Sequence, residues 1–524
     1  MTKREMRRQV LQRLVQCGIL IEPEALEHVL RQPEPLSYVE QVLGRLGQMP
    51  LHLTMSHMTS PNSAEEAHGG HAAERSAGAR AAQTVIPPSE DQDGSRSNYN
   101  LFGGGASKHH RPRGSGYRDG DARECEPMID ILCSAAEGVR CSGDVTDFKR
   151  YFNSRFELLS KVLREKPELA STMDIEVARR YEREVAVVGV VSEVRIARDR
   201  GRYTILRLED TTGEITVLIA DPKDYVLTDE VIGVTGTVKR GRTGEHTLFA
   251  ERIVHPGVQM RQPRLSSRPL SVALISDIHV GSRYFMPEAW GKFMRWLKSD
   301  DPLAKRLKYL LIAGDLVDGI GIFPSQEEEL EMHDIHHQYQ ALAALLDEIP
   351  EHVEVLLIPG NHDAVRLSEP QPPLARELRG VIGERFHFLG NPSLIALDGV
   401  RVLGYHGKGI DDFVGRVGTL GYTQPAEIMA EMLKRRHLCP VYGGKTQIMP
   451  TGTDHLAISQ VPEIFVTGHI HTSAVGHYRG VMTISASAWQ SQTPYQVTRN
   501  IRPDPGKVVV VDLDTLAHEV RVFA

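Results

Sequence analysis

The 524-residue chain lacks the features that mark several special classes of protein. It has five cysteines and no CxxC pair, so neither a disulfide framework nor a zinc site of closely spaced cysteines is expected. No apolar run approaches the roughly 20 residues that span a bilayer. Polar residues interrupt any signal-peptide core in the basic N-terminal segment. The sequence therefore predicts a cytoplasmic protein that does not enter a membrane.

The chain has no large excess of charge of one sign, and its aromatic residues are few. Lys and Arg number 61 against 68 Asp and Glu, which gives a formal net charge of −7, and aromatic residues make up 6%. This balance excludes a strongly basic nucleic-acid coat, although a local basic groove can coexist with it. Hydrophobic residues, at 41%, are enough for a sizeable core. Histidine is abundant, with 23 residues, which raises the question whether histidines cluster with carboxylates.

Composition and periodicity divide the chain into several domains. Residues 1–55 carry apolar side chains at helical spacing, which predicts a small helical N-terminal module. Residues 56–125 are rich in Gly, Ser, Ala and charge, which predicts a flexible linker. Helical periodicity returns in residues 126–182, where aromatic and aliphatic residues share one face.

Residues 183–262 contain five short β-rich segments separated by turn signals such as Thr212-Gly213. Five strands in so short a segment suit a small barrel, and the segment resembles an OB-fold, a common module for single-stranded nucleic acid. Tyr203 and Phe249 alone do not make a stacking platform, however. Binding of protein therefore remains open beside binding of DNA as the role of this barrel.

Residues 263–524 alternate apolar strand-like runs with helical runs, which predicts an α/β domain. Open α/β sheets build their sites at the C-terminal ends of strands. Asp, His and Asn side chains offer oxygen and nitrogen ligands and no thiolate, which suits Mn²⁺, Zn²⁺ or Fe²⁺. Five strand-like runs end in such residues: Asp277-Ile278-His279, Gly314-Asp315 followed by Asp318, Gly360-Asn361-His362-Asp363, His406-Gly407 and Gly468-His469-Ile470-His471.

This series of DxH, GDxxD, GNHD, an isolated His and GHxH resembles the motif series of calcineurin-like metallophosphoesterases. The resemblance implies an α/β phosphoesterase sandwich with two divalent metal ions, expected to be Mn²⁺ with Mg²⁺ as the alternative. Such ions polarise a phosphate and lower the pKa of a water. Carried over by position, the resemblance implies one metal at Asp277, His279 and His471, a second at Asn361, His406 and His469, and Asp315 bridging both.

The same resemblance assigns roles to residues that do not bind metal. His362 would protonate the leaving oxygen or stabilise the transition state. Asp363 would orient the His362 imidazole, and Asp318 would support the ligands from outside the site. Lys445 and Gln490 follow the motifs in the chain and are candidate contacts for a DNA end.

The surrounding sequence narrows the family. The order of helices, linker, barrel and phosphoesterase is similar to that of the small subunits of archaeal family D DNA polymerases, and so are the segments DIHVGSRYF, GDLVDGIGIFP, YGGKTQIMP and SASAWQSQTPYQ. This resemblance covers most of residues 126–524. It implies a proofreading 3′–5′ exonuclease acting on single-stranded or mismatched 3′ ends, paired with a large catalytic subunit as a heterodimer or larger complex. A non-catalytic assembly subunit and a stand-alone metallophosphatase are the alternatives.

Overall fold

The structure is a computed structural model, and its chain divides into two compact units, residues 1–109 and 110–524. Among the residues it describes, no helix combines the length and the hydropathy needed to cross a bilayer. The described residues are 6, 10, 13, 14, 20, 21, 23–45, 52, 53, 121–135, 139–197, 203–220, 225–241, 244–498 and 500–524.

Among its described residues, the first unit includes the helices α2 (Pro23–Leu30) and α3 (Pro35–Arg45). Their buried faces meet in a small apolar cluster that includes Val29 and Val39. The two-residue strands β1 (Leu20–Ile21) and β2 (His52–Leu53) pair in parallel. The predicted linker, residues 56–125, lies outside the described residues as far as position 120.

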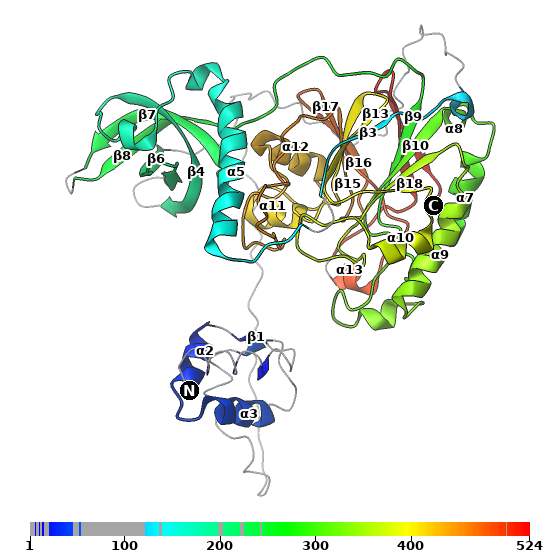
Figure 1. Ribbon diagram of the computed structural model, residues 1–524, viewed down its shortest axis with the longest axis horizontal. Helices are drawn as coiled ribbons and strands as arrows, with labels where there is room; N and C mark the ends of the chain where they lie inside the picture. Colours follow the sequence, from blue (N-terminus) through cyan, green and yellow to red (C-terminus); the bar gives the residue numbers. More distant parts are fainter. Residues whose placement is uncertain are drawn as a thin grey trace, which may run out of the picture. The chain divides into compact units, whose positions relative to one another are not determined.

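The barrel predicted for residues 183–262 is present in the second unit and is closed (Figure 1). Helix α5 (Val145–Arg164) precedes it and is capped by Asp144, whose carboxylate accepts hydrogen bonds from the backbone N–H groups of Thr146 and Asp147. The short helices η2 (Pro167–Leu169) and α6 (Ile175–Ala178) lead into the first strand. The strands, in the order β4-β5-β6-β8-β7, are β4 (Glu184–Ala197), β5 (Tyr203–Glu209), β6 (Glu214–Ala220), β7 (Val231–Arg240) and β8 (His246–Val254).

The rest of the second unit is a sandwich of two six-stranded sheets, as the α/β pattern predicts; we call it the sandwich domain. Side chains of both sheets form the core between them, among them Leu311 and Val466. The first sheet, in spatial order, is β12 (His387–Phe388), β11 (Glu354–Ile358), β10 (Leu307–Ala313), β9 (Ser271–Ile275), β18 (Lys507–Asp512) and β19 (His518–Val522). The second is β16 (Ala474–Tyr478), β17 (Val481–Ser485), β15 (Ile464–Thr467), β14 (Val400–Gly404), β13 (Ser393–Leu397) and β3 (Ile129–Ser134).

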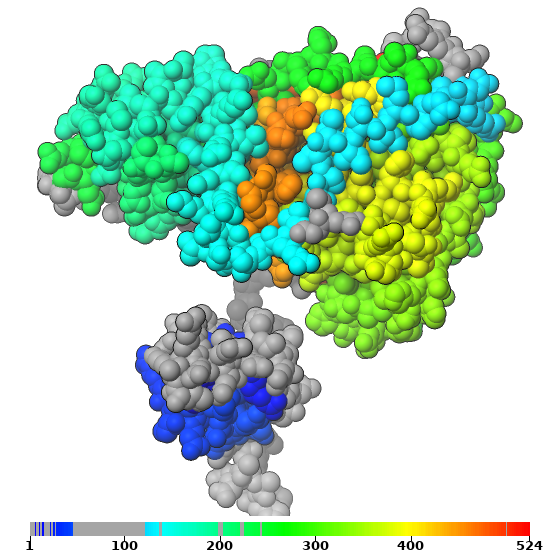
Figure 2. Space-filling view, in the orientation of Figure 1, coloured from blue at the N-terminus to red at the C-terminus, as the bar shows by residue number. Residues whose placement is uncertain are grey.

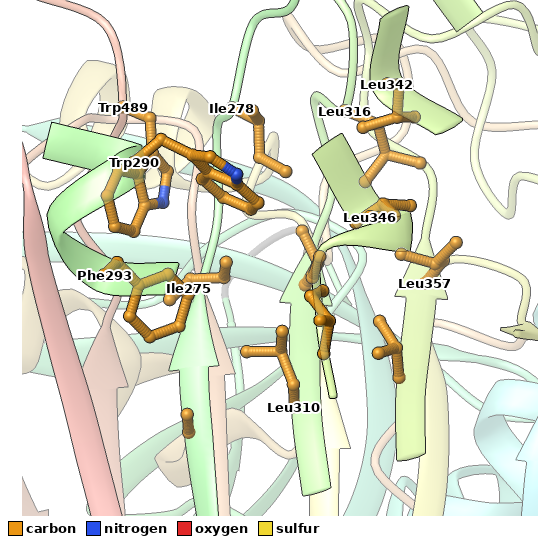
Figure 3. Packing of buried hydrophobic residues seen from close by; sticks show 14 of the residues in the cluster. Ile275, Ile278, Trp290, Phe293, Leu310, Leu316, Leu342, Leu346, Leu357 and Trp489 are labelled. Atoms are coloured by element: carbon orange, nitrogen blue, oxygen red, sulfur yellow. The ribbon is translucent and has the colours of Figure 1, made fainter. Parts of the chain in front are cut away.

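Helices cover the outer faces of the sandwich. On the first sheet, Trp290 and Phe293 of α7 pack with Trp489, and the Trp290 and Trp489 ring centroids are 5.0 Å apart (Figure 3). The helices on this face are α7 (Pro287–Leu297), α8 (Pro302–Lys305), α9 (Ile335–Asp347) and α10 (Arg376–Ile382). Helices α11 (Ile410–Arg416) and α12 (Pro425–Arg435) cover the second sheet, and α13 (Pro494–Thr498) follows β17.

The helical prediction for residues 126–182 is wrong at its start. Ile129–Ser134 form the strand β3, which pairs antiparallel with β13 at the edge of the second sheet. Figure 2 shows the segment in cyan, lying against the yellow and green surface of the sandwich domain. Four of its six residues are exposed, so no periodic apolar pattern marks it in the sequence. The sandwich domain therefore includes a strand that precedes the barrel in the chain, and it does not begin at residue 263.

Candidate metal centre

The motif residues meet where strands of both sheets end. Asp277 and His279 follow β9 of the first sheet, and His471 follows β15 of the second. The Nε2 atom of His471 lies 3.3 Å from Oδ1 of Asp277 and 3.1 Å from Nε2 of His279. Three potential ligand atoms from two sheets thus face one point.

A second group surrounds His406, which follows β14. Its Nε2 atom lies 3.3 Å from Oδ2 of Asp315 and 3.0 Å from Oδ1 of Asn361. Asp315, His406 and His469 each place one potential ligand atom within 4.8 Å of the others. Oδ2 of Asp315 is also 3.7 Å from Nε2 of His279, so Asp315 lies between the two groups. The structure brings all seven predicted ligands together, and their binding of metal remains a prediction.

The backbone of this centre is strained. Non-glycine residues rarely have a positive φ, because Cβ then crowds the backbone, and each costs of order 1–3 kcal/mol. Strain of this kind clusters at functional sites, since the rest of the fold must hold it in place. Five of the seven predicted ligands have it: φ is 53° at Asp277, 54° at His279, 51° at Asp315, 72° at His469 and 56° at His471.

Glycines in the motifs allow the ligands to approach the backbone. A Cβ atom at Gly314 would lie 2.4 Å from Nδ1 of His406, and one at Gly360 would lie 2.2 Å from Oδ1 of Asp315. Both distances are far shorter than any van der Waals contact. The ligand geometry therefore requires residues without a side chain at these two positions.

Hydrogen bonds from outside the centre hold the imidazole rings. Nδ1 of His279 lies 2.9 Å from Oδ1 of Asp318, so this carboxylate can hold the ring, and its role in supporting a metal ligand stays a prediction. Nδ1 of His406 lies 3.0 Å from the carbonyl oxygen of Ala313. With Nδ1 engaged, each ring directs Nε2 at the other ligands, which is the arrangement that orients histidines toward a metal.

Two partners of the histidines lie outside the metal-ligand motifs, and the sequence analysis gave neither a role, although Gln496 ends the quoted segment SASAWQSQTPYQ. The side-chain amide of Gln496 lies 2.9 Å from Nδ1 of His471. Oδ2 of Asp411 lies 3.3 Å from Nε2 of His469 and accepts a hydrogen bond from Nζ of Lys408 at 2.7 Å. Burial would raise the pKa of Asp411, but the charges of His469 and Lys408 hold it well below its usual range. Only the position of Asp411, five residues after His406, could have drawn attention to it.

His362 stands beside the two groups. Its Nδ1 atom lies 2.7 Å from the carbonyl oxygen of Asp318, and its Nε2 atom lies 4.0 Å from Oδ2 of Asp315. The backbone N–H of His362 donates to Oδ1 of Asp315 at 2.8 Å. The hydrogen bond at Nδ1 therefore holds the ring in an orientation in which Nε2 faces the ligand groups.

The predicted role of Asp363 in orienting His362 is wrong. The Asp363 carboxylate turns back into the protein and accepts hydrogen bonds from the backbone N–H of Gly360 at 2.8 Å and the Tyr339 hydroxyl at 3.1 Å. It satisfies buried donors of the turn that carries the motif, which explains why a carboxylate is needed there. The carbonyl oxygen of Asp318 takes the place beside His362.

The electrostatics of the centre call for positive charge. Burial would raise the pKa of Asp315, but the charges of His406 and His362 hold it well below its usual range. Burial lowers the pKa of His406, yet the Asp315 carboxylate beside it raises the value to about 9. Carboxylates buried together need compensating charge. Protons on the imidazoles can supply it, and divalent cations would supply it by displacing those protons. The donor set thus fits the predicted metal ions in both chemistry and charge.

Comparison with known proteins assigns the chain to a family. A family model described as the B subunit of DNA polymerase alpha/epsilon matches residues 272–475, and one described as an OB-fold nucleic acid binding domain matches residues 185–255. The DNA polymerase II small subunit of Archaeoglobus fulgidus is 43% identical over 380 residues, covering 71% of this chain and 76% of the relative. That of Halobacterium salinarum is 35% identical over 527 residues, covering 98% of each chain. The chain belongs to the family of DNA polymerase II small subunits, the small subunits of archaeal family D.

The resemblance found in the sequence is thereby confirmed. The DNA polymerase II small subunit of Methanothermobacter thermautotrophicus is a third relative, 41% identical over 401 residues that cover 73% of this chain and 81% of the relative. The polymerase family model spans every predicted ligand of this small subunit, and the OB-fold match coincides with the closed barrel.

The centre of this small subunit opens into a cavity of about 590 Å³. Lys445 lines the cavity and remains a candidate DNA contact. Gln490 also lines it, but the side chain is 4% exposed and its amide donates to Oγ of Ser282 at 2.9 Å and Oδ1 of Asp318 at 3.1 Å. Its amide N–H groups are thus engaged by Ser282 and Asp318, which corrects the prediction that Gln490 reaches for DNA.

Proposed function

We propose that this small subunit is a metal-dependent 3′–5′ exonuclease that hydrolyses DNA phosphodiesters and proofreads for the polymerase. One observation carries the proposal: both sheets deliver an undegraded set of oxygen and nitrogen ligands to the two sides of Asp315, at the floor of an open cavity. An inert scaffold would have no reason to keep this strained and highly charged arrangement.

Two divalent cations, expected to be Mn²⁺ with Mg²⁺ as the alternative, fit the centre. Bound there, they would polarise the phosphate and lower the pKa of an attacking water. Asp315 would contact both. Asp277, His279 and His471 would hold one cation, and Asn361, His406 and His469 the other.

His362 would act on the leaving group. Its Nδ1 is occupied by the Asp318 carbonyl, so Nε2 is the atom that can exchange a proton with substrate. Burial lowers the pKa of His362, and the charge of Asp315 opposes this in part. A phosphodiester bound beside the ring would add negative charge and favour the protonated form. The proton would then pass from Nε2 to the departing 3′ oxygen of the preceding nucleotide.

The relatives are named small subunits, and we propose a large catalytic subunit as the partner of this chain, in a heterodimer or larger complex. DNA with single-stranded or mismatched 3′ ends is the proposed substrate. The OB-fold match supports a nucleic-acid contact by the barrel, and docking of protein there remains an alternative. We also propose that the protein acts in the cytoplasm, as the sequence predicts.

Replacement of His362 tests the proposal. In complex with the large subunit, His362→Ala should lose about 10²–10⁴-fold of Mn²⁺-dependent digestion of a single-stranded 3′ end, because it lacks the proton donor. His333→Ala, at an exposed histidine outside the centre, is the control and should digest DNA like the wild type. Both variants should still co-purify with the large subunit.

Other outcomes point elsewhere. Digestion by His362→Ala at the wild-type rate would contradict the mechanism. Hydrolysis of an aryl phosphate with no action on oligonucleotides would favour a metallophosphatase. A wild-type complex that pairs with the large subunit but hydrolyses neither substrate would favour an assembly role.

A further inference from the structure

One part of the cavity wall is aromatic. Phe323, on the segment between β10 and η3 (Gln326–Glu329), lies against Tyr495 of α13, with ring centroids 4.8 Å apart and planes inclined by 31°. The Phe323 ring is also 6.3 Å from the ring of His362. Both aromatic residues line the cavity, and Tyr495 is 39% exposed. The aromatic surface therefore begins directly beside the proposed proton donor.

An aromatic surface is not needed to bind phosphate. The metal ligands, His362 and the cavity lysines already supply polar and cationic groups for that purpose. Aromatic rings left facing water in a concave site gain free energy when a flat apolar group covers them. Ile322 and Ile501 line the same cavity and add aliphatic surface. These side chains fit a part of the substrate other than its backbone.

The charges of the wall separate two kinds of contact. Glu329 lines the cavity beside the aromatic pair, and its Oε1 accepts the backbone N–H of Tyr495 at 3.3 Å. A carboxylate there repels phosphate but not a neutral base. Lys408 is instead linked to His469 through Asp411. This cationic group therefore lies beside the ligand group of Asp315, His406 and His469. Because Lys408 is already paired with Asp411, the contrast rests on Glu329: the wall beside Phe323 disfavours phosphate and admits a neutral base.

We propose that Phe323 and Tyr495 form a subsite that stacks on the unpaired base of the 3′-terminal nucleotide. The inference rests on the proposed exonuclease function and names its substrate class: a terminal nucleotide whose base is free to leave the duplex. Stacking beside His362 places the terminal phosphodiester at the metal centre. A paired base must first break its hydrogen bonds to the opposite strand before it can reach the rings. A mismatched base costs less free energy to unpair. Selection of mismatched ends then follows from the unpairing cost.

Substrates with and without a terminal base test the subsite in the two-subunit complex. For a single-stranded oligonucleotide, Phe323→Ala and Tyr495→Ala should lower kcat/KM about five- to hundredfold, the range expected for loss of one base–aromatic stack. For the same oligonucleotide ending in an abasic nucleotide, kcat/KM should stay unchanged. Phe323→Tyr and Tyr495→Phe keep the rings and should retain activity. Val497→Ala is the matched control, because Val497 lies on the same helix, is 59% exposed and does not line the cavity.

A binding measurement separates this inference from the proposed function. A 3′-terminal 2-aminopurine, joined through a phosphorothioate that resists hydrolysis, should lose fluorescence on binding the wild type and keep it with the double alanine variant. Equal losses of kcat/KM on normal and abasic ends would overturn the subsite, because they would mean that the rings only support His362. A wild type that digests no DNA yet quenches the probe would refute the exonuclease and retain the stacking site. Digestion without quenching would refute the stacking site alone.

Discussion

Arg155 of helix α5 donates a hydrogen bond from Nε to Oδ2 of Asp454 at 2.6 Å, although the two residues lie 299 positions apart. The pair is inside the protein, with side chains 0% and 1% exposed. The guanidinium also donates to the carbonyl oxygens of Asp229 and Pro440, at 2.6 Å each, and to the Tyr151 hydroxyl at 2.8 Å. One buried cation thus joins the helix before the barrel, a barrel loop and the sandwich domain.

Removal of the Asp454 carboxylate should therefore destabilise the protein strongly. Asp454→Ala leaves a buried guanidinium without its counter-charge. Such a change typically lowers the free energy of unfolding by about 3–5 kcal/mol. Urea unfolding should show a matching fall in the free energy of unfolding. Glu214→Ala is the control, because it breaks an exposed ion pair with Arg207, with side chains 47% and 52% exposed, and should cost about 1 kcal/mol or less. Equal effects of the two changes would refute this account.

Asp318→Asn should weaken metal binding without removing a ligand. The change takes away the negative charge that holds Nδ1 of His279 at 2.9 Å. Loss of such a supporting partner typically lowers metal affinity about 10–100-fold. Calorimetric titration with Mn²⁺ should show the weaker binding, and excess Mn²⁺ should restore part of any nuclease activity. Asp300→Asn, at a side chain 95% exposed, should bind Mn²⁺ like the wild type.

Affinity for Mn²⁺ should rise with pH. Burial lowers the pKa of His406, but Asp315 raises it to about 9, so the ring carries a proton at neutral pH when no cation is bound. A metal ion must displace that proton, and raising the pH toward 9 makes the displacement easier by up to about tenfold in affinity per pH unit and proton. Titrations between pH 6 and 8, in buffers of different ionisation enthalpy, should report proton release. An affinity that does not change with pH would contradict this prediction.

Glu369 should make stability depend on pH. Burial raises the pKa of its carboxyl to about 7, and the Tyr405 hydroxyl, donating at 2.9 Å, opposes the rise only in part. The folded state then holds a proton that the unfolded state releases near pH 4.3. Stability contributed by this proton is present at low pH and is lost as pH rises from about 4 to 7, by up to roughly 1.4 kcal/mol per pH unit.

Glu369→Gln isolates that contribution. The amide keeps the shape of the neutral acid, so the thermal midpoint of the variant should fall less between pH 5 and 7 than that of the wild type. Glu377→Gln, at an exposed position, should leave the wild-type pH dependence intact. Parallel curves for wild type and Glu369→Gln would show that Glu369 is not the group responsible.

The sequence is most informative where local pattern and tertiary position coincide. Each apolar strand of the centre ends directly at its motif, so the sequence alone can place residues such as Asp277 and His469 at one edge of the sandwich. Asp363 is misjudged because adjacency to His362 says nothing about which way a side chain turns. Asp411 and Gln496 are missed because their contacts depend on how α11 and α13 pack, which no short segment encodes.

Strand β3 gives the chain a particular order of assembly. Ser134 at its end meets Ser393 of β13, 259 positions later. Because the ribosome adds about 5–20 residues per second, roughly 10–50 s pass between the synthesis of β3 and that of the strand with which it pairs. The strands of the barrel pair among themselves, so the barrel is synthesised and can close during this interval. A gene cut between the codons for residues 262 and 263 would strip the second sheet of its edge, so barrel and sandwich can be exchanged between proteins only as one piece.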